Sequence, residues 1–431
     1  MNEYDSNRIY DLLEKKNYKR TDQLKDVDCY ILNTCHIREK ATEKVYHDVG
    51  RVKKIFRHKK KPIVIVTGCV AQAEGDILLK REKYIDAVIG PQSYHSIADT
   101  ILKIERKCKE INLTDFQTIE KFDKLNLVSN SSSNVSSFLT IQEGCDKFCK
   151  FCVVPYTRGA EFSRSIEEIL KETLGLIKNG AREITLLGQN VNAYNFEGKK
   201  LSDLIKKISK ISGINRIRYT TSHPLDFSED LVAIHKDCKK LMPLIHLPVQ
   251  SGSNKILKNM NRKHTIEHYL ELINKLKKVN PLIEFSSDFI IGYPGETKKD
   301  FEDTIKIMKK VKFINSYSFL YSSRPGTPAA KLKSVDENIS KERLLTFQKI
   351  ANEIKMQYRR DLFNKKFLVL FENKVKNKDA FFGRDQYNNS VIVNTQENLI
   401  GKIKEVKITG GNLNTLFGEI NSKFKNRDVA A

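Results

Sequence analysis

Short continuous hydrophobic runs alternate with helically spaced segments in the first part of the chain. Cys29–Thr34 and Pro62–Thr67 have the composition of buried strands, and a helical pattern runs between them from Ile37 toward Val52. Continuous apolar runs separated by helices are typical of parallel strands covered on both faces. We therefore expect a doubly wound α/β domain over residues 1–120.

The next part opens with a polar stretch rich in Ser and Asn, which predicts a linker over residues 121–137. Residues 138–361 then repeat a strand–loop–helix rhythm. One helix is well marked, because Ser165 and Glu168 form a capping box and Gly180 marks its end. Six strand units in succession predict an open or partial (β/α) barrel. The expected strands are Phe138–Gln142, Glu183–Leu187, Arg216–Thr220, Leu244–Leu247, Glu284–Ile291 and Ser316–Tyr321.

The pattern changes again over residues 362–425, where short strands alternate with Gly/Asn turns and residues 426–431 form a tail. This pattern predicts a small OB-like β-barrel, a fold that often binds oligonucleotides. A purely structural barrel fits it equally well. The expected strands are Phe367–Phe371, Val391–Val393 and Lys402–Ile408, and the candidates for RNA contact are Phe381, Phe382, Arg384, Tyr387 and Lys402.

Composition narrows the class of protein. The chain has 431 residues, 40% hydrophobic and 30% charged, and lacks an apolar run long enough for a membrane span. Lys+Arg 76 against Asp+Glu 53 gives a net charge of +23, which favours a polyanionic partner such as RNA or DNA. A genome that favours Lys would give the same excess without any partner. The 8 cysteines are unevenly spaced, which argues against a secreted disulfide framework and for the cytoplasm.

Three of those cysteines fall in one short segment, Cys145, Cys149 and Cys152. Zinc sites usually take four ligands from two separated pairs. Three clustered thiols suit a cubane iron–sulfur cluster instead, because each thiolate binds one iron and the fourth iron stays open. An open iron can hold S-adenosylmethionine (SAM) through its amine and carboxylate. The spacing therefore indicates radical chemistry rather than a structural metal site.

A second pair, Cys35 and Cys69, directly follows two predicted strands. Ligands in doubly wound sheets bind at the carboxyl ends of strands. The matching positions of the two thiols suggest one shared site, although buried free thiols are also common. Cys29, Cys108 and Cys238 lack this placement and are expected to be packing or surface residues.

Several motifs together resemble the methylthiotransferase family of radical SAM enzymes, most closely the branch that acts on isopentenylated adenosine in tRNA. The resemblance covers nearly the whole chain. Its motifs are Met1–Ser6, Leu32–Ala41, Gly68–Gln72, Gly144–Gly159, Leu187–Asn190, Thr221–Pro224, His246–Ser253, Gly292–Glu296 and Ser323–Thr327.

The resemblance implies an amino-terminal domain with an auxiliary 4Fe-4S cluster, a radical SAM domain with a second 4Fe-4S cluster, and a TRAM domain that contacts RNA. The implied reaction adds a methylthio group to carbon 2 of N6-isopentenyladenosine beside the anticodon. A ring C–H bond has no acidic proton, so a radical from SAM is needed to open it. The implied partners are the tRNA anticodon loop and an electron donor such as flavodoxin or ferredoxin. The protein itself is expected to be a cytoplasmic monomer without membrane contact.

The resemblance also assigns residues. Cys145, Cys149 and Cys152 are the expected ligands of the SAM cluster, and Cys35 and Cys69 those of the auxiliary cluster. Polar or turn residues at strand ends are expected near SAM, with capping or turn roles as the alternative. They are Gln189, Asn190, Gln250, Ser251 and Gly292. Arg158, Arg164 and Arg324 are weaker candidates for phosphate or carboxylate contact.

One departure concerns the auxiliary cluster, for which the family pattern has three cysteines. The first of them precedes the Asn-Glu-Tyr-Asp-Ser segment, where this sequence starts at Met1. We expect the start of translation upstream of Met1, with Cys29 as a substitute ligand or loss of sulfur insertion as the alternatives. Two other functions stay open: a sibling methylthiotransferase for threonylcarbamoyl-adenosine in tRNA or for a ribosomal protein, and a noncatalytic iron–sulfur RNA-binding protein.

Overall fold

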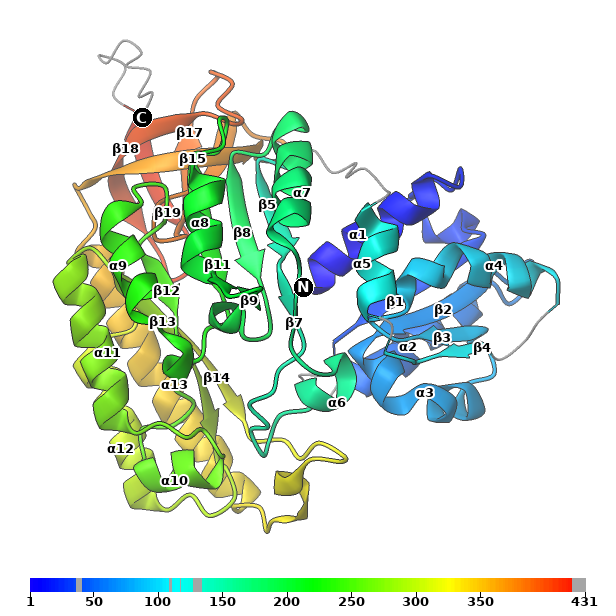
Figure 1. Cartoon of the computed structure of the whole chain (residues 1–431), viewed down its shortest axis with the longest axis horizontal. Coiled ribbons are helices and arrows are strands. Elements are labelled where there is room, and N and C mark those ends of the chain that lie inside the picture. The colour runs from blue at the N-terminus through cyan, green and yellow to red at the C-terminus, as the bar shows by residue number, and fades with distance from the viewer. Residues whose placement is uncertain (36–40, 108–110, 117, 127–133, 421–431) are drawn as a thin grey trace.

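The computed structural model describes residues 1–35, 41–107, 111–116, 118–126 and 134–420. The chain forms three parts (Figure 1). An amino-terminal α/β domain lies against one side of a central open barrel, and a small carboxy-terminal barrel packs at one end of the central one. The predicted helix start at Ile37, Cys108 and the tail lie outside the described residues.

The amino-terminal domain is built on a parallel sheet of order β1-β2-β3-β4. One hydrophobic core lies between this sheet and helices α2 and α3, and a second joins the other face to α1, α4 and α5. Helices thus cover both faces, as the apolar runs predict. The elements are α1 (Asn2–Glu14), β1 (Cys29–Thr34), α2 (Ala41–Ile55), β2 (Ile63–Gly68), α3 (Cys69–Arg81), β3 (Ala87–Ile89), α4 (Ile97–Glu105), β4 (Ile111–Leu113) and α5 (Thr118–Asn126).

Helix α5 crosses the expected boundary at residue 120. Its Phe122 and Leu125 are buried in the same core as Ile9 and Leu13 of α1. The helix therefore packs as part of the amino-terminal domain. Residues 136 and 137, which the sequence suggested were linker, already belong to the first strand of the central barrel.

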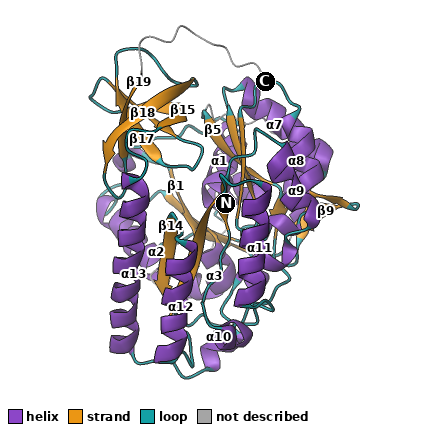
Figure 2. Ribbon diagram, turned by 90° about the vertical axis from the view of Figure 1, so that its left-hand side faces the viewer, coloured by secondary structure: helices purple, strands orange, loops and turns teal. Residues whose placement is uncertain are grey.

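The central barrel consists of two parallel three-stranded sheets, β11-β8-β5 and β12-β13-β14. A bridge between Ile217 and Leu241 joins them, so the barrel stays open between β5 and β14. All six predicted strands are present, and long helices cover the outer surface (Figure 2). The strands are β5 (Ser136–Thr140), β8 (Glu183–Leu187), β11 (Arg216–Thr220), β12 (Leu244–His246), β13 (Glu284–Ile291) and β14 (Asn315–Leu320). The helices are α7 (Ile166–Lys178), α8 (Leu201–Ser209), α9 (Glu229–Asp237), α11 (Ile266–Val279), α12 (Lys298–Val311) and α13 (Glu337–Arg360).

Short elements sit on the loops of this barrel. The Ser165 hydroxyl caps α7 by accepting the Glu168 N–H, as predicted. The short elements are β6 (Gln142–Glu143), α6 (Val154–Arg158), β7 (Phe162–Ser163), β9 (Asn195–Phe196), β10 (Lys199–Lys200) and α10 (Asn254–Asn259). The 3-10 turns are Leu24–Asp26, Tyr94–Ser96, Val191–Ala193, Pro224–Asp226 and Pro328–Lys331.

The carboxy-terminal part is a closed barrel of order β15-β16-β17-β19-β18. Three of its strands match the predicted runs, whereas β16 and β19 were missed because Gly383 and Gly418 interrupt their apolar pattern. The strands are β15 (Lys366–Lys374), β16 (Ala380–Arg384), β17 (Ser390–Asn394), β18 (Ile403–Gly411) and β19 (Leu416–Ile420). Of the candidate RNA contacts, Phe381 and Tyr387 are buried packing residues.

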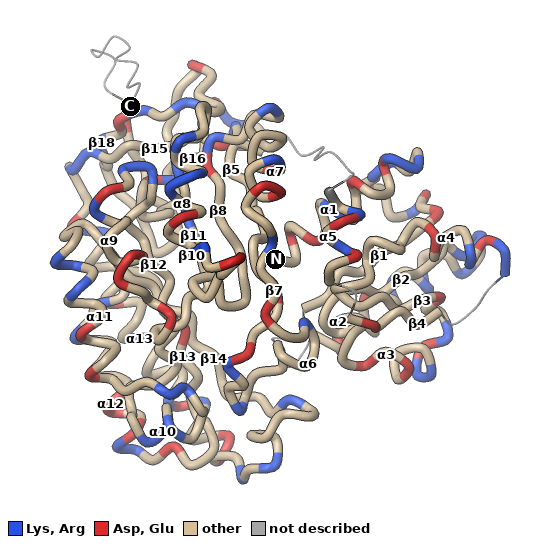
Figure 3. Tube along the Cα trace, viewed as in Figure 1, with Lys and Arg blue, Asp and Glu red and all other residues tan. Residues whose placement is uncertain are grey.

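Charge is distributed over all three parts. Lys and Arg occur throughout the trace, with Asp and Glu interspersed (Figure 3). Every helix among the described residues is too short or too polar to cross a bilayer. The basic excess is therefore spread over the molecule rather than confined to one element.

Candidate active site

The three clustered cysteines lie in one loop at the mouth of the central barrel. The loop follows β6 and ends in helix α6. Cys149 is buried, while Cys145 and Cys152 are partly exposed. The Cys152 N–H donates to the Cys149 carbonyl at 2.9 Å, which forms a tight turn between these two ligands. We refer to residues 145–152 as the cysteine loop.

Two glycines hold the ends of the cysteine loop together. Gly144 has φ +77°, and a Cβ there would lie only 2.6 Å from the Gly159 carbonyl oxygen. The Cys145 N–H donates to that same carbonyl at 3.2 Å. Only glycine permits this close approach together with a left-handed backbone conformation. The glycine that begins the motif Gly144–Gly159 is therefore required by the geometry of the loop.

The donor set of the cysteine loop fits a cubane cluster. Among the residues the structure describes, no three His, Cys, Asp or Glu side chains are close enough to hold a single metal ion. A cubane cluster instead needs cysteines that are spaced further apart, because each cysteine binds a different iron. The pKa of Cys145 and of Cys152 is raised to about 12, mainly by burial, and the Cys149 charge contributes in the same direction. The three sulfurs therefore repel one another as thiolates, and bound cations would relieve this repulsion.

Cys35 and Cys69 meet at one edge of the amino-terminal sheet. Strands β1 and β2 pair in parallel with Thr34 beside Gly68, and each cysteine is the next residue along its strand. Gly68 has φ +92°, and a Cβ there would lie 2.7 Å from Asn33 Oδ1, so the chain can turn sharply into α3 only with glycine. The two residues thus follow paired strand ends at the same edge of the sheet, and a ligand shared by their thiols stays a prediction.

Cys29 does not join this pair. It is the first residue of β1, whereas Cys35 follows the last, which separates them by roughly 20 Å along an extended strand. Burial raises the pKa of Cys29 to about 12, consistent with its place in the hydrophobic core of α1 and α4. The suggestion that Cys29 could serve as a substitute ligand was therefore wrong. Cys238 packs against the core of the central barrel, as expected.

Gln189 and Asn190 lie in the turn that follows β8. Gln189 Oε1 accepts the Gly144 N–H at 2.7 Å, and its amide donates to the Met1 sulfur. Asn190 Nδ2 donates to Asp226 Oδ2 at 2.7 Å, while its Oδ1 is buried with no hydrogen-bond partner in the described part of the chain. Gln189 thus holds the residue before the cysteine loop. Asn190 is linked to the loop through Asp226, which pairs with Lys147, and has an acceptor left for a ligand.

Gln250, Ser251 and Gly292 have mainly structural contacts. Gln250 has φ +73° and bridges to Phe289 of β13. The Ser251 hydroxyl accepts the Ser253 N–H at 3.2 Å at the start of α10. These contacts fit the alternative of turn and capping duty, and contact of these residues with SAM stays a prediction.

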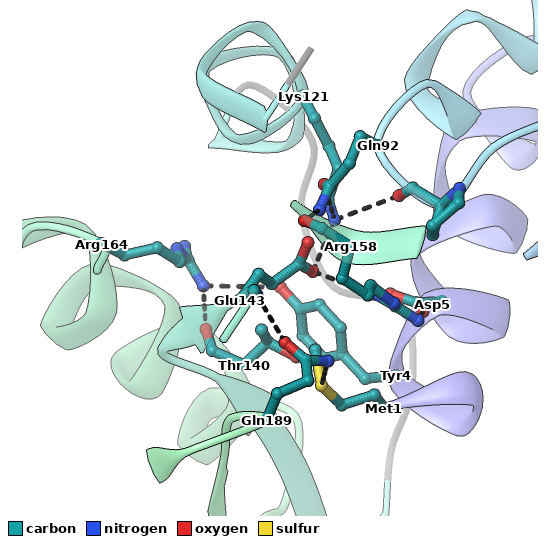
Figure 4. A network of polar contacts seen from close by, with 12 residues as sticks. Met1, Tyr4, Asp5, Gln92, Lys121, Thr140, Glu143, Arg158, Arg164 and Gln189 are labelled. Carbon is teal, nitrogen blue, oxygen red and sulfur yellow. Dashed lines mark hydrogen bonds and ion pairs between the residues drawn. The ribbon is translucent and has the colours of Figure 1, made fainter. Parts of the chain in front are cut away.

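A buried polar network between the domains was missed by the sequence reasoning (Figure 4). Arg158 donates to Asp5 at 2.7 Å and to Glu143 at 3.4 Å, and Lys121 donates to Glu143 at 2.5 Å and to Gln92 at 3.1 Å. Lys121 and Glu143 are fully buried. Their partners come from segments far apart in sequence, so no local pattern reveals the network.

The network reaches both cysteine sites. Burial opposes the charge of Arg158, but Asp5 and then the Cys69 thiolate hold its pKa well above the ordinary value. Cys69 likewise contributes to the raised pKa of Cys152. Cys69 and the cysteine loop therefore lie within electrostatic range of each other.

Arg164 also departs from its expected role. Its side chain is buried and pairs with Glu172 at 2.8 Å, and it donates to the Thr140 carbonyl at 2.7 Å. Neither Arg158 nor Arg164 is an exposed arginine available to phosphate, because buried carboxylates already bind both. From the sequence, both are only weak candidates for contact with phosphate or a carboxylate.

Three family models match the chain: "Uncharacterized protein family UPF0004" over residues 1–90, "Radical SAM superfamily" over 139–308 and "TRAM domain" over 364–420. Each match coincides with one of the three structural parts.

Curated relatives match over nearly the full length. A protein of Pelagibacter ubique is 57% identical over 99% of this chain and 97% of its own. Proteins of Rickettsia akari and of Wolbachia pipientis are 48% and 49% identical, each over 97% of both chains. All three are named tRNA-2-methylthio-N(6)-dimethylallyladenosine synthase.

Among solved structures, the radical SAM methyltransferase TsrM of Kitasatospora setae, with cobalamin and a [4Fe-4S] cluster, superimposes with a TM-score of 0.56. The match covers 76% of this chain and 74% of that one at 12% identity. At this identity the similarity concerns the fold alone.

Proposed function

The chain belongs to the family of tRNA-2-methylthio-N(6)-dimethylallyladenosine synthases, and we propose that it adds a methylthio group to carbon 2 of N6-isopentenyladenosine beside the anticodon of tRNA. It is thus a radical SAM methylthiotransferase. The proposal rests on one observation: full-length similarity to these synthases, with the cysteine loop at the mouth of the barrel.

In this proposal Cys145, Cys149 and Cys152 hold a 4Fe-4S cluster that, when bound, supplies the electron for reductive cleavage of SAM. The surrounding residues fix the three thiols. Gln189 accepts the Gly144 N–H at the start of the loop. Asn190 offers its unpaired Oδ1 toward a ligand beside the loop.

Cys35 and Cys69 are the ligands that this chain contributes to an auxiliary 4Fe-4S cluster. Support comes from their position at one sheet edge and from the electrostatic reach of Cys69 to Cys152. A cluster here would lie beside the cysteine loop, as transfer of sulfur to a base held between the two sites requires. Arg158, with a raised pKa, would balance part of the negative charge of the thiolates.

The proposed partners follow from the same family. The TRAM barrel would hold the anticodon stem-loop of tRNA, whose unstacked bases suit recognition in single-stranded form. A flavodoxin or ferredoxin would deliver electrons. We propose that the enzyme works as a cytoplasmic monomer.

Nucleoside analysis of tRNA tests the function. A strain deleted for this gene should accumulate isopentenyladenosine without the methylthio group, and the wild-type chain should restore the modification. The Cys149→Ala variant should not restore it. Normal methylthio levels in the deletion strain would refute the proposal, and loss of a methylthio group from threonylcarbamoyl-adenosine instead would identify the sibling activity.

A further inference from the structure

Residues 260–262, just after α10, contact the cysteine loop at three consecutive positions. The Met260 carbonyl accepts the Lys150 N–H at 3.0 Å. Asn261 Nδ2 donates to the Phe148 carbonyl at 3.0 Å. Arg262 donates to the Cys149 sulfur at 3.6 Å. Main-chain and side-chain contacts thus fix this segment directly against the central ligand of the loop.

The residues on both sides of this contact, Phe148 and Asn261, have a left-handed backbone conformation. Phe148 has φ +47° and Asn261 has φ +61°. For a bulky residue such as Phe this conformation is strained, and it persists only where surrounding contacts impose it. The Asn261 bond to the Phe148 carbonyl is one such contact. The strained residue directly precedes Cys149, so the contacts that impose its conformation also hold the backbone from which that thiol extends.

Arg262 is itself held in place. Its side chain is buried, with 6% of the residue exposed, and it donates a second bond to the Pro248 carbonyl at 2.8 Å. His223 and His264 lie close to it, and Lys147 of the loop is paired with Asp226 at 2.7 Å. Burial and the Arg262 charge lower the pKa of both imidazoles, so they stay neutral at physiological pH. No carboxylate forms an ion pair with Arg262 among the described residues, and the Cys149 sulfur accepts one of its N–H groups.

We infer that Arg262 is a positioning residue that sets the reduction potential of the SAM cluster by donating an N–H to the Cys149 sulfur. Hydrogen bonds to the sulfurs and nearby positive charge are among the factors that set cluster potentials. Reduction adds one electron from a low-potential donor such as flavodoxin and requires no proton, so the cluster gains one negative charge. A buried guanidinium at the sulfur stabilises this reduced state more than the oxidised one.

The inference rests on the proposed cluster site, and its test does not require tRNA. Anaerobically reconstituted protein is titrated with dithionite, and the reduced cluster is followed by electron paramagnetic resonance. Cys35 and Cys69 are replaced by Ala in every variant, so only one cluster contributes. We expect Arg262→Met to lower the ratio of reduced to oxidised cluster roughly tenfold at a fixed potential, about 59 mV for a one-electron couple.

Two further variants separate the causes. Arg262→Lys keeps the charge without the guanidinium geometry and should show a smaller negative shift. Lys147→Met removes a positive charge from the same loop without removing a bond to sulfur, and should shift the potential less than Arg262→Met. Iron content and circular dichroism establish that each variant is loaded and folded.

The inference is overturned if Arg262→Met retains its iron and has the wild-type potential, or shifts no further than Lys147→Met. If Arg262→Met does not retain iron, Arg262→Lys decides, and a wild-type potential there overturns the inference equally. Failure of the proposed function would look different, because tRNA would remain unmodified by a protein whose cluster potential still depends on Arg262.

Discussion

The side chains of Asp5 and Arg158 form a buried ion pair, 2.7 Å from Oδ2 to the guanidinium, that joins the first helix of the chain to α6, the helix that follows the cysteine loop. Both side chains are about 2% exposed. Burial alone would raise the pKa of Asp5, but Arg158 and then Lys121 outweigh it and hold this pKa below the ordinary value. The pair thus couples the position of the amino-terminal domain to that of the cysteine loop.

Replacement of Asp5 by Asn should destabilise the protein by about 3–5 kcal/mol, because it leaves the Arg158 charge buried with only Glu143 at 3.4 Å. Thermal unfolding followed by circular dichroism measures the loss. Asp22→Asn, at an exposed position, is the matched control and should change stability by less than about 0.5 kcal/mol. Equal stability of the two variants would show that the pair does not hold the domains together.

Iron counting separates the two proposed cluster sites. Anaerobic reconstitution of the wild-type chain should give about eight irons, and Cys35→Ala with Cys69→Ala should leave about four. Replacing Cys145, Cys149 and Cys152 by Ala should remove the other four together with the release of 5′-deoxyadenosine from SAM. About four irons in the wild-type chain would mean that the auxiliary site does not form.

How much could be predicted depended on how local each feature is. The strands Cys29–Thr34, Glu183–Leu187 and Glu284–Ile291 match the structure residue for residue, because each contains a short apolar run of strand length that can be recognised locally. The cysteine loop was equally accessible, since its three cysteines fall within eight consecutive residues.

The contacts around the ligands could not be predicted in this way. Arg262 lies 113 residues from Cys149, and Arg158 lies 153 residues from Asp5. Nothing in the local sequence distinguishes these arginines from the many exposed ones. The sequence therefore points to the cysteines as candidate ligands, but it offers Arg158 only as a weak candidate for phosphate or carboxylate contact and gives no sign of the role of Arg262.

Gly292, expected near SAM, has a packing role that predicts a large effect of substitution. Its φ is +74°, and a Cβ there would lie 2.8 Å from the Ser340 Cβ of α13. Gly292→Ala should destabilise the protein by about 1–3 kcal/mol through backbone strain and this clash.

Adding Ser340→Gly to that variant should recover the stability lost through the clash. The stability lost through backbone strain should remain, and thermal unfolding measures both contributions. Gly50 of α2 is the control, because it has open space and a helical backbone, so Gly50→Ala should stabilise by up to about 1 kcal/mol. If Gly292→Ala proved as harmless as Gly50→Ala, α13 could not approach β13 as closely as described.

The carboxy-terminal barrel is attached through Arg216 and Arg218 of β11. Arg216 donates to the carbonyls of Arg384 and Leu368 at 2.8 and 2.7 Å, and Arg218 donates to those of Gln386 and Asp385 at 2.9 Å each. Burial lowers the pKa of Arg216 to about 10, so its charge persists at physiological pH.

Arg216→Met with Arg218→Met should release the barrel, because four carbonyls lose charged donors worth about 1.5–3 kcal/mol each. Limited proteolysis should then cut between α13 and β15 and free a barrel fragment, while the wild type resists. Arg51→Met, at an exposed site of α2, should leave the digestion pattern unchanged. Resistance of the double variant would show that other contacts suffice for docking.

The buried His235 makes stability depend on pH. Its imidazole lies against the Tyr219 hydroxyl at 2.6 Å, its Nδ1 has no hydrogen-bond partner in the described part of the chain, and burial lowers its pKa from 6.5 to about 4. Above pH 6.5 the imidazole is neutral in both the folded and the unfolded chain, so this site contributes no pH dependence there. Below pH 6.5 His235 binds a proton in the unfolded chain but not in the folded chain. Stability therefore falls until the pH passes about 4.

The lost free energy of unfolding amounts to roughly 3 kcal/mol across this range. His235→Gln cannot titrate, so its stability should fall less steeply than that of the wild type between pH 6.5 and 4. Both proteins have the same His264, whose pKa burial also lowers to about 4, so the difference between their slopes isolates His235. His58→Asn, an exposed histidine, is the control. Parallel slopes for wild type and His235→Gln would mean that this imidazole accepts its proton in the folded state, and hence that the space around it admits water.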